Sequence, residues 1–197
     1  MQKQLSRLSG STIGGVQVFG IGHSTHPPEE FVVLLSAHEI GQLADIRTVP
    51  RSRRWPHFGT DELAASLPAH GIAYAHLPAL GGWRRPVADS PNGGWRNRSF
   101  QGYADYALTD DFAAGLAELC NLVRERPTAM MCSEGLWWRC HRRLVADRLV
   151  ATGWEVQHIA PDGGTTRHQL PDFAVVRTDG RVVYPPHDDG RLSILTT

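Results

Sequence analysis

The order of the predicted secondary-structure elements limits the fold of this chain more than any other feature. Short apolar segments that are typical of buried strands cover residues 16–22, 42–49, 72–78, 128–133 and 154–160. Segments with helix start and stop signals lie between them, at residues 27–41, 60–71, 109–126 and 139–153. This alternation predicts an α/β fold, a three-layer sandwich with a mainly parallel five-stranded sheet. It does not predict the order of the strands.

The two ends of the chain differ in character from this alternating body. Residues 1–15 contain basic side chains but no apolar run, so we expect a flexible lead-in rather than a secretion signal. Residues 168–186 predict a small C-terminal hairpin that turns at Thr178-Asp179-Gly180. No linker interrupts the rest, and we expect residues 16–197 to form a single α/β domain.

Cysteine count and hydropathy point to a cellular setting. The three cysteines, Cys120, Cys132 and Cys140, are too few for a disulfide framework and suit a reducing compartment. No apolar run approaches the roughly 18 residues that a membrane span needs. We therefore expect a cytoplasmic protein that does not bind membranes.

Polar side chains follow several of the predicted strands. His23 and Ser24 follow the first strand, and Asp45 and Arg47 end the second. The run MCSEGLWWRCHRR (131–143) starts at the end of the fourth strand and holds two cysteines, a glutamate, a histidine and three arginines. Ligands of open α/β sheets bind beyond the carboxyl ends of the strands. These strand ends therefore predict a functional site.

Several dispersed motifs share one resemblance. They are IGHST (21–25), ADIRTVPRSRRWPHF (44–58), GIAYAHLPALGG (71–82), SPNGGWRNRSFQGYADY (90–106) and MCSEGLWWRCHRRLVAD (131–147). In this order, between residues 17 and 160, they resemble the domain of unknown function 488 family. The family's usual elements fall here on Asp45, Arg47, Pro50, Ser52 and Arg53, and on Cys132, Glu134, Cys140, His141 and Arg142. The resemblance implies the fold and the site, but no reaction, because the family's function is not established.

A metal site is one interpretation of the run at 131–143. Cys132, Cys140 and His141 are residue types that bind zinc. Zinc ligands usually come in pairs two to four residues apart, whereas these cysteines are separated by eight positions. In the predicted helix from residue 139, Cys140 and His141 would also point about 100° apart. We therefore expect no metal and no other cofactor.

A reactive thiol is a second interpretation. Cys132 follows a buried strand and leads towards a predicted helix, with Arg139 and His141 nearby. Cationic neighbours and helix N-termini lower the pKa of a thiol. Such an arrangement is typical of sulfurtransferase or phosphatase loops, although the carboxylate of Glu134 would oppose both a thiolate and a bound phosphate.

Paired carboxylates are a third interpretation. Asp45 and Glu134 end neighbouring parts of the predicted site, and two carboxylates can cleave a glycosidic bond as acid, base or nucleophile. Alternatively, Asp45 forms a structural ion pair with Arg47, Arg142 or another arginine. Glu134 is harder to explain structurally, because a carboxylate at a strand-to-helix turn is costly to bury without a role.

Arginine and tryptophan occur side by side in the loops. Trp55, Trp83, Trp95 and the pair Trp137-Trp138 each adjoin an arginine in the sequence. Arginine binds phosphate and aromatic rings stack on bases, as a flipped-out or single-stranded nucleotide requires. The simpler alternative is that arginine stacks on tryptophan to pack irregular loops.

The leading hypothesis from these patterns is a hydrolase or transferase that acts on a nucleotide or nucleic acid, and specifically one that cuts a base–sugar bond as a DNA glycosylase does. A non-catalytic nucleic-acid-binding module and a cysteine-dependent sulfurtransferase or phosphatase are the alternatives. The predicted catalytic residues are Glu134, Asp45, Cys132 and His141. The predicted substrate-binding residues are His23, Ser24, Arg47, Ser52, Arg53, Tyr74, Trp137, Trp138, Arg139 and Arg142.

Overall fold

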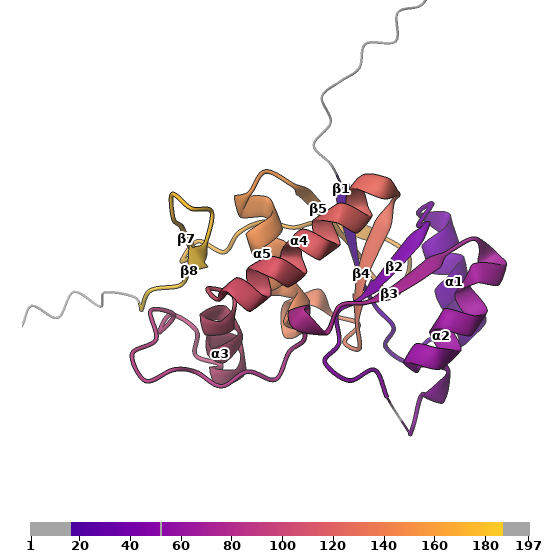
Figure 1. Ribbon diagram of the computed structural model, residues 1–197, viewed down its shortest axis with the longest axis horizontal. Coiled ribbons are helices and arrows are strands. Elements are labelled where there is room, and N and C mark those ends of the chain that lie inside the picture. Colours follow the sequence, from indigo (N-terminus) through magenta and orange to yellow (C-terminus); the bar gives the residue numbers. More distant parts are fainter. Residues whose placement is uncertain (1–16, 52, 187–197) are drawn as a thin grey trace, which may run out of the picture.

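The computed structural model describes residues 17–51 and 53–186 and has a six-stranded central sheet (Figure 1). Its strand order is β3-β2-β4-β1-β5-β6, in which the first five strands are parallel. The strands are β1 (Gln17–Gly22), β2 (Gln42–Asp45), β3 (Ala73–His76), β4 (Thr128–Cys132), β5 (Glu155–Ile159) and β6 (Thr165–Arg167). The mainly parallel sheet of the sequence prediction is confirmed.

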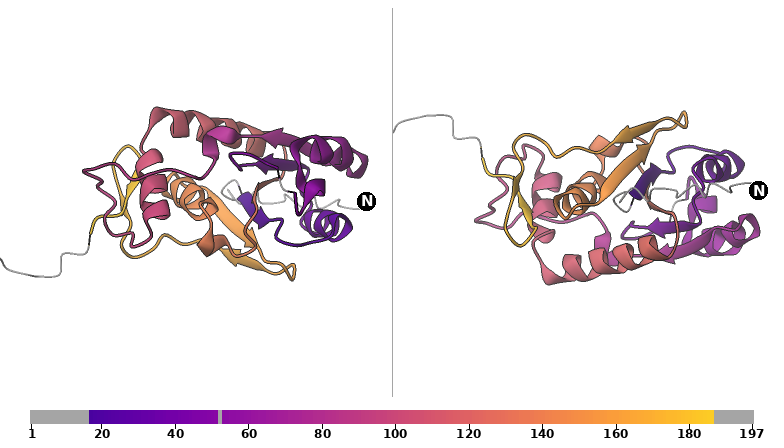
Figure 2. Two further views of the ribbon diagram at one scale, coloured as in Figure 1. Left: turned by 90° about the horizontal axis from the view of Figure 1, so that it is seen from below. Right: turned by 90° about the horizontal axis from the view of Figure 1, so that it is seen from above.

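Helices cover both faces of this sheet and make the three predicted layers (Figure 2). They are α1 (Pro28–Ala37), α2 (Thr60–Ser66), α3 (Arg98–Tyr106), α4 (Asp110–Glu125) and α5 (Arg142–Ala151). The core side chains of α1 and α2 pack on one face, and those of α3, α4 and α5 on the other. Successive residues of β4 supply the two cores in turn, because strand side chains alternate between faces.

Local sequence signals account for most of these helix ends. Thr109 caps α4, because its hydroxyl accepts a hydrogen bond from the Phe112 N–H at 3.3 Å. α2 stops at Ser66, and a 3₁₀ turn (Leu67–His70) follows it. Pro68 lies in that turn, where its missing N–H does the least harm to hydrogen bonding.

Two elements were not predicted. β6 pairs antiparallel with β5 and extends the sheet from the expected five strands to six. Its sequence, TTR, is short, polar and exposed, so it shows no strand pattern. α3 begins inside the segment 79–101 that was expected to be a loop, with Asn97 accepting a hydrogen bond from the Ser99 N–H as its cap. The predicted hairpin is confirmed as β7 (Val175–Val176) and β8 (Val182–Val183).

The start of α5 also differs from its prediction. The helix was expected from residue 139, but it begins at Arg142, after a separate 3₁₀ turn (Trp137–Arg139). Cys140 between them has an extended backbone, with φ −124° and ψ 150°. This break has chemical consequences, because it leaves Cys140 and His141 outside the regular helix.

The strand order of the sheet determines where the candidate site lies. β1 leads to β2, which lies beyond β4, and β4 leads to β5, which lies beyond β1. The ends of β1, β4 and β2 are therefore neighbours, with Gly22 opposite Cys132 and Asp45 opposite Met131. Such a switch in direction opens a crevice at the carboxyl ends of the strands.

Some predictions about the chain ends remain predictions. The lead-in at residues 1–15 and the last residues of the expected domain, 187–197, lie outside the described residues. Within the described part of the chain, no helix is long and apolar enough to cross a membrane.

Candidate active site

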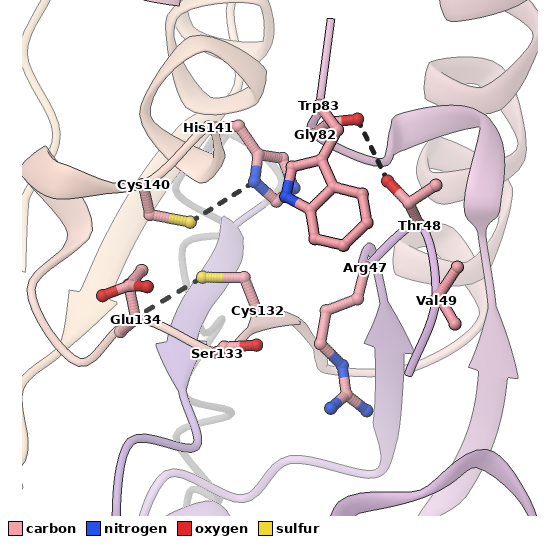
Figure 3. Close-up of a pocket in the computed structure, with 10 residues that line it drawn as sticks. All are labelled: Arg47, Thr48, Val49, Gly82, Trp83, Cys132, Ser133, Glu134, Cys140 and His141. Atoms are coloured by element: carbon pink, nitrogen blue, oxygen red, sulfur yellow. Dashed lines mark hydrogen bonds between the residues drawn. The ribbon is translucent and has the colours of Figure 1, made fainter. Parts of the chain in front are cut away.

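A small cavity of about 150 Å³ opens at the carboxyl ends of β2 and β4 (Figure 3). Its walls come from segments that are far apart in the sequence: Arg47, Thr48, Val49, Gly82, Trp83, Cys132, Ser133, Glu134, Cys140 and His141. A second hollow adjoins it and shares Arg47, Val49, Ser133 and Glu134 with it. The second hollow adds His23 and Ser24, so the ends of β1, β2 and β4 form one continuous site.

Two thiols meet at the floor of the cavity. The Cys132 thiol donates to the Glu134 carbonyl oxygen at 3.7 Å, and it can donate to the Cys140 sulfur instead when Cys140 is ionised. Both cysteine side chains are buried. The Cys140 sulfur also accepts a hydrogen bond from the Arg142 backbone N–H at 3.4 Å. The guanidinium Nη1 of Arg142 lies 3.1 Å from the Cys132 sulfur. Arg142 therefore contacts both sulfurs, Cys140 through its backbone N–H and Cys132 through its guanidinium.

His141 completes the group around the thiols. Its Nε2 lies 3.0 Å from the Ile46 carbonyl oxygen, which can only accept, so Nε2 carries the proton. In a neutral imidazole this leaves a lone pair on Nδ1, which lies 3.6 Å from the Cys140 sulfur. Sequence reasoning placed Cys140 and His141 on one helix, pointing apart. That prediction was wrong, because the extended backbone at Cys140 turns its thiol towards the imidazole.

The environment separates the acidities of the two thiols. Burial raises the pKa of Cys132 well above the ordinary thiol value. Burial also acts to raise the pKa of Cys140, but the hydrogen bond from Cys132 and the charge of Arg142 outweigh it and lower that pKa. The pKa of His141 is lowered by burial, which favours the neutral imidazole. Cys140 is therefore the thiol that ionises first.

Arg142 fastens the loop that carries these groups. The side chain is fully buried, and its guanidinium donates to the carbonyl oxygens of Ile21, Glu134 and Gly135. The loop lies so close to β1 that a Cβ on Gly22 would be 1.8 Å from the Glu134 carbonyl oxygen. Only glycine allows this approach. The approach holds the loop that follows Cys132 against the end of β1.

Asp45 and Arg47 form a closed structural unit beside the cavity. Asp45 is fully buried, and its two oxygens accept from Arg47 Nε at 2.8 Å and Arg47 Nη2 at 2.5 Å. Tyr74 donates its hydroxyl to Asp45 at 2.9 Å, and Arg47 Nη2 also donates to the Phe58 carbonyl at 2.7 Å. Burial and the Asp45 charge raise the pKa of Tyr74 well above its ordinary value. The ion pair that the sequence allowed for Asp45 is present, with Arg47 as its partner.

His23 extends this unit towards β1. Its Nε2 lies 3.2 Å from Arg47 Nη1, and its ring stacks on Phe58 with ring centroids 4.2 Å apart. Burial and the nearby Arg47 charge lower the pKa of His23 to about 4. The imidazole is therefore neutral at pH 7 and accepts a hydrogen bond from Arg47. Ser24 follows with a left-handed backbone, φ 49°, at the edge of the second hollow.

The other predicted residues take different places. Glu134 lies at the rim, with an exposed side chain. Trp137 stacks on His158, with centroids 4.4 Å apart and rings 8° from parallel, and so packs behind the cavity. Three exposed residues, Arg53, Trp138 and Arg139, line neither hollow. Ser52 lies outside the described residues.

Sequence reasoning missed six residues of the cavity as site members: Thr48, Val49, Gly82, Trp83, Ser133 and Cys140. Cys140 was quoted in the run at 131–143, and its place directly before His141-Arg142 was the signal that could have identified it. Trp83 stands at the cavity mouth, 89 % exposed and with a left-handed φ of 63°. Thr48 donates its hydroxyl to the Gly82 carbonyl at 3.0 Å and had no recognisable sequence signal.

The described residues contain no group of three or more His, Cys, Asp or Glu side chains that could hold a metal ion. The chemistry that this arrangement offers is that of a nucleophile, a base and an orienting group: the Cys140 thiol, the His141 imidazole and the Ile46 carbonyl. Cys132 and Arg142 stabilise the thiolate form of Cys140.

Comparison with known proteins identifies the family. The family model described as "Domain of unknown function DUF488" matches residues 27–149, more than half of the chain. The chain belongs to the DUF488 family. The match includes both site cysteines and His141, whereas the last residues of this DUF488 protein's sheet, from β5 onwards, lie beyond it. A search of curated proteins and a search of solved structures each found no match.

Proposed function

We propose that this DUF488 protein is a cysteine-dependent sulfurtransferase with Cys140 as its nucleophile. The observation that carries the proposal is the contact between the Cys140 sulfur and His141 Nδ1, 3.6 Å apart in a small cavity, with a second thiol that can donate to the same sulfur when Cys140 is ionised. A base beside a thiol of lowered pKa is the usual way to activate a sulfur nucleophile. A reducing cytoplasm would keep both thiols free for this chemistry.

The proposed step balances with a persulfide, R–S–SH, as donor. His141 Nδ1 takes the proton from Cys140, and the thiolate attacks the outer sulfur of the donor. The S–S bond of the donor breaks as the new bond forms, and R–S⁻ leaves with the electron pair and regains the proton from His141. The products are Cys140–S–SH and R–SH. An acceptor nucleophile then takes the outer sulfur and restores the Cys140 thiol.

Phosphatase chemistry has less support. A phosphatase needs an arginine fork and backbone amides free to hold the phosphate oxygens. Arg47 donates its hydrogen bonds to Asp45, Phe58 and His23. Arg142 donates from its two Nη groups to carbonyl oxygens and to Cys132, so both guanidinium groups are already engaged within the protein. The Glu134 carboxylate at the rim would also repel a phosphate in this cavity.

Glycosidic bond cleavage by two carboxylates also has less support. Asp45 is fully buried and accepts hydrogen bonds from Arg47 and Tyr74 at both of its oxygens. It does not line either hollow. Glu134 is then left as the one predicted carboxylate at the cavity, whereas this mechanism requires a pair.

A basic hollow near the cavity supports a phosphate-bearing sulfur acceptor, a nucleotide or nucleic acid. It is lined by Arg84, Arg85, Pro86, Arg98 and Ser99. The first of these residues directly follows Trp83, which stands at the cavity mouth. The Arg84 guanidinium is held 3.6 Å above the Tyr106 ring. None of its three arginines has a carboxylate partner within the described part of the chain. Concentrated and unpaired positive charge of this kind attracts phosphates.

Removing two charges from this basic hollow is expected to weaken oligonucleotide binding. The double substitution Arg85→Ala/Arg98→Ala should lower the slope of log affinity against log salt by about 1.4 for a single strand, about 0.7 for each phosphate that is no longer neutralised. Fluorescence anisotropy with a labelled single-stranded oligonucleotide across a salt series measures this slope. Arg167→Ala, on the exposed edge strand β6, is the control and should leave the slope unchanged. No binding by the unaltered protein at low salt would exclude a nucleic-acid acceptor.

Sulfur transfer itself can be tested directly. Incubation with glutathione persulfide should add one sulfur atom to the protein, and peptide mapping by mass spectrometry should locate it on Cys140. Addition of a thiol acceptor should then remove this sulfur. Cys120 on α4 serves as the internal control, because burial raises its pKa and it lies outside the cavity. A persulfide on neither site cysteine, in a protein whose Cys140 alkylates rapidly, would contradict the proposed activity.

A further inference from the structure

A chain of buried polar side chains lies directly behind the thiol site. Asp147 on α5 accepts a hydrogen bond from the Tyr184 hydroxyl at 2.5 Å and lies 2.7 Å from His168 Nε2. His168 Nδ1 in turn lies 2.9 Å from Nε2 of His158 on β5. All four side chains are buried, and the chain ends beside Arg142.

The hydrogen bonds of this chain have one consistent direction. The Asp147 carboxylate can only accept, so His168 donates from Nε2, and the neutral form of this imidazole has a lone pair on Nδ1. His158 then donates from Nε2 to that lone pair, which leaves a lone pair on its own Nδ1. Burial is the largest cause that lowers the pKa of His158, to about 2, so this imidazole is neutral.

A buried acceptor and a buried donor, each without a partner in the part of the molecule that the structure describes, lie at the end of this row of hydrogen-bonded side chains. His158 Nδ1 and Arg142 Nε are both buried, and neither has a hydrogen-bond partner among the described residues. They lie on the same side of β1, since a Cβ on Gly20 would be 2.7 Å from His158 Nδ1 and 3.2 Å from Arg142 Cδ. The lone pair on His158 Nδ1 is what an N–H of Arg142 requires. A small approach of the two side chains would satisfy both.

We propose that Asp147, His168 and His158 are positioning residues that hold the Arg142 guanidinium against Cys132 and thereby set the reactivity of the thiol pair. The inference rests on the proposed function, in which these thiols are the reacting groups. It links the buried Arg142 charge to a distant carboxylate, Asp147, through the side chains of His158 and His168. No carboxylate forms a direct ion pair with Arg142 in the described part of the chain.

Packing around the chain supports a positioning role. Trp137 covers His158 face to face and touches His168 edge-on, with centroids 5.1 Å apart, so both imidazoles have fixed planes. This explains a tryptophan of the run at 131–143 that does not reach the cavity. His158, His168 and Tyr184 lie beyond the region that the family model matches. The C-terminal part of the chain thus completes the support of the site.

The decisive experiment measures thiol ionisation in a variant that interrupts this row of hydrogen-bonded side chains. His158→Phe keeps a flat ring against Trp137 but removes the hydrogen bond to His168 and the Nδ1 acceptor near Arg142. Loss of a well-placed cation should raise the pH midpoint of iodoacetamide labelling at Cys132 and Cys140 by roughly one unit and slow labelling at pH 7 roughly tenfold. The other titratable groups facing these thiols, His141, Glu134 and Tyr103, are unchanged in this variant. Peptide mapping separates these sites from Cys120.

Two further variants separate positioning from packing. His158→Gln has an amide that can accept from Arg142 and donate to His168, so its midpoint should stay near that of the unaltered protein. In an Arg142→Lys background, which lacks the Nε donor, His158→Phe should add no further shift. An unchanged midpoint in folded His158→Phe, equal shifts in the Phe and Gln variants, or additive shifts in the double variant would each overturn the proposal.

Labelling does not depend on sulfur transfer. A shifted midpoint in a protein that never forms a persulfide would leave the positioning role standing and contradict the proposed activity. Normal persulfide formation with an unchanged midpoint would do the reverse.

Discussion

Replacing Cys140 by serine is expected to lower sulfur transfer by on the order of a thousandfold or more, since the hydroxyl is a far weaker nucleophile towards sulfur. The fold should persist, because serine fits the same space and can still accept the Arg142 N–H. The loss is measured as the initial rate at which sulfur passes from glutathione persulfide to an added acceptor thiol. Far-ultraviolet circular dichroism checks that the variant is folded.

The matched variant for this prediction is Cys132→Ser. Serine at this position can still donate a hydrogen bond to Cys140, so we expect a loss of only about tenfold, within the range of one weakened hydrogen bond to a charged group. The converse result, with Cys132→Ser inactive and Cys140→Ser active, would make Cys132 the nucleophile. In the unaltered protein the rate should rise with pH and level off below the ordinary pKa of a thiol, because the thiolate attacks and the pKa of Cys140 is lowered.

The second large effect concerns stability. Asp45→Asn should lower the free energy of unfolding by about 3–5 kcal/mol, because it leaves the Arg47 charge buried and without its counter-charge. Urea denaturation measures the change. Asp110→Asn is the control: its ion pair with Arg181 is exposed, and we expect a loss below about 1 kcal/mol.

The same variant also discriminates between mechanisms. If Asp45 is structural, folded Asp45→Asn protein at low temperature should keep most of its activity. If Asp45 is an acid, base or nucleophile, activity should vanish in protein that is still folded. Equal and small losses of stability in Asp45→Asn and Asp110→Asn would contradict the structural role assigned to the buried pair.

Much of the fold followed from local patterns. Thr109 and the acidic residues after it predicted the start of α4, and the apolar run from Thr128 to Cys132 predicted a strand buried on both faces. β6 escaped prediction because it is short, polar and exposed, and α3 because it is polar on average and begins inside a segment rich in glycine, proline and arginine. β6 is held by pairing with β5, and α3 by the burial of residues such as Tyr103. Such stabilisation comes from partners that are distant in the sequence.

The candidate site was predictable as a place but not as a mechanism. Sequence position put His23, Asp45 and Cys132 at strand ends, and the structure brings those ends together. The sequence did not show that Arg47 donates to both oxygens of Asp45, or that Trp137 packs behind the cavity on His158. Which polar groups are already satisfied depends on contacts between residues far apart in the chain.

By itself, the sequence determined the layered α/β architecture, because alternating strand and helix patterns have few other ways to bury their apolar faces. It also determined which residue types stand at the strand ends. The tertiary structure alone decided that β4 lies between β1 and β2, and that an extended backbone at Cys140 turns its thiol to His141. Strand order depends on non-local hydrogen bonding, and the acidity of a thiol depends on the charges and burial that only the folded chain assembles.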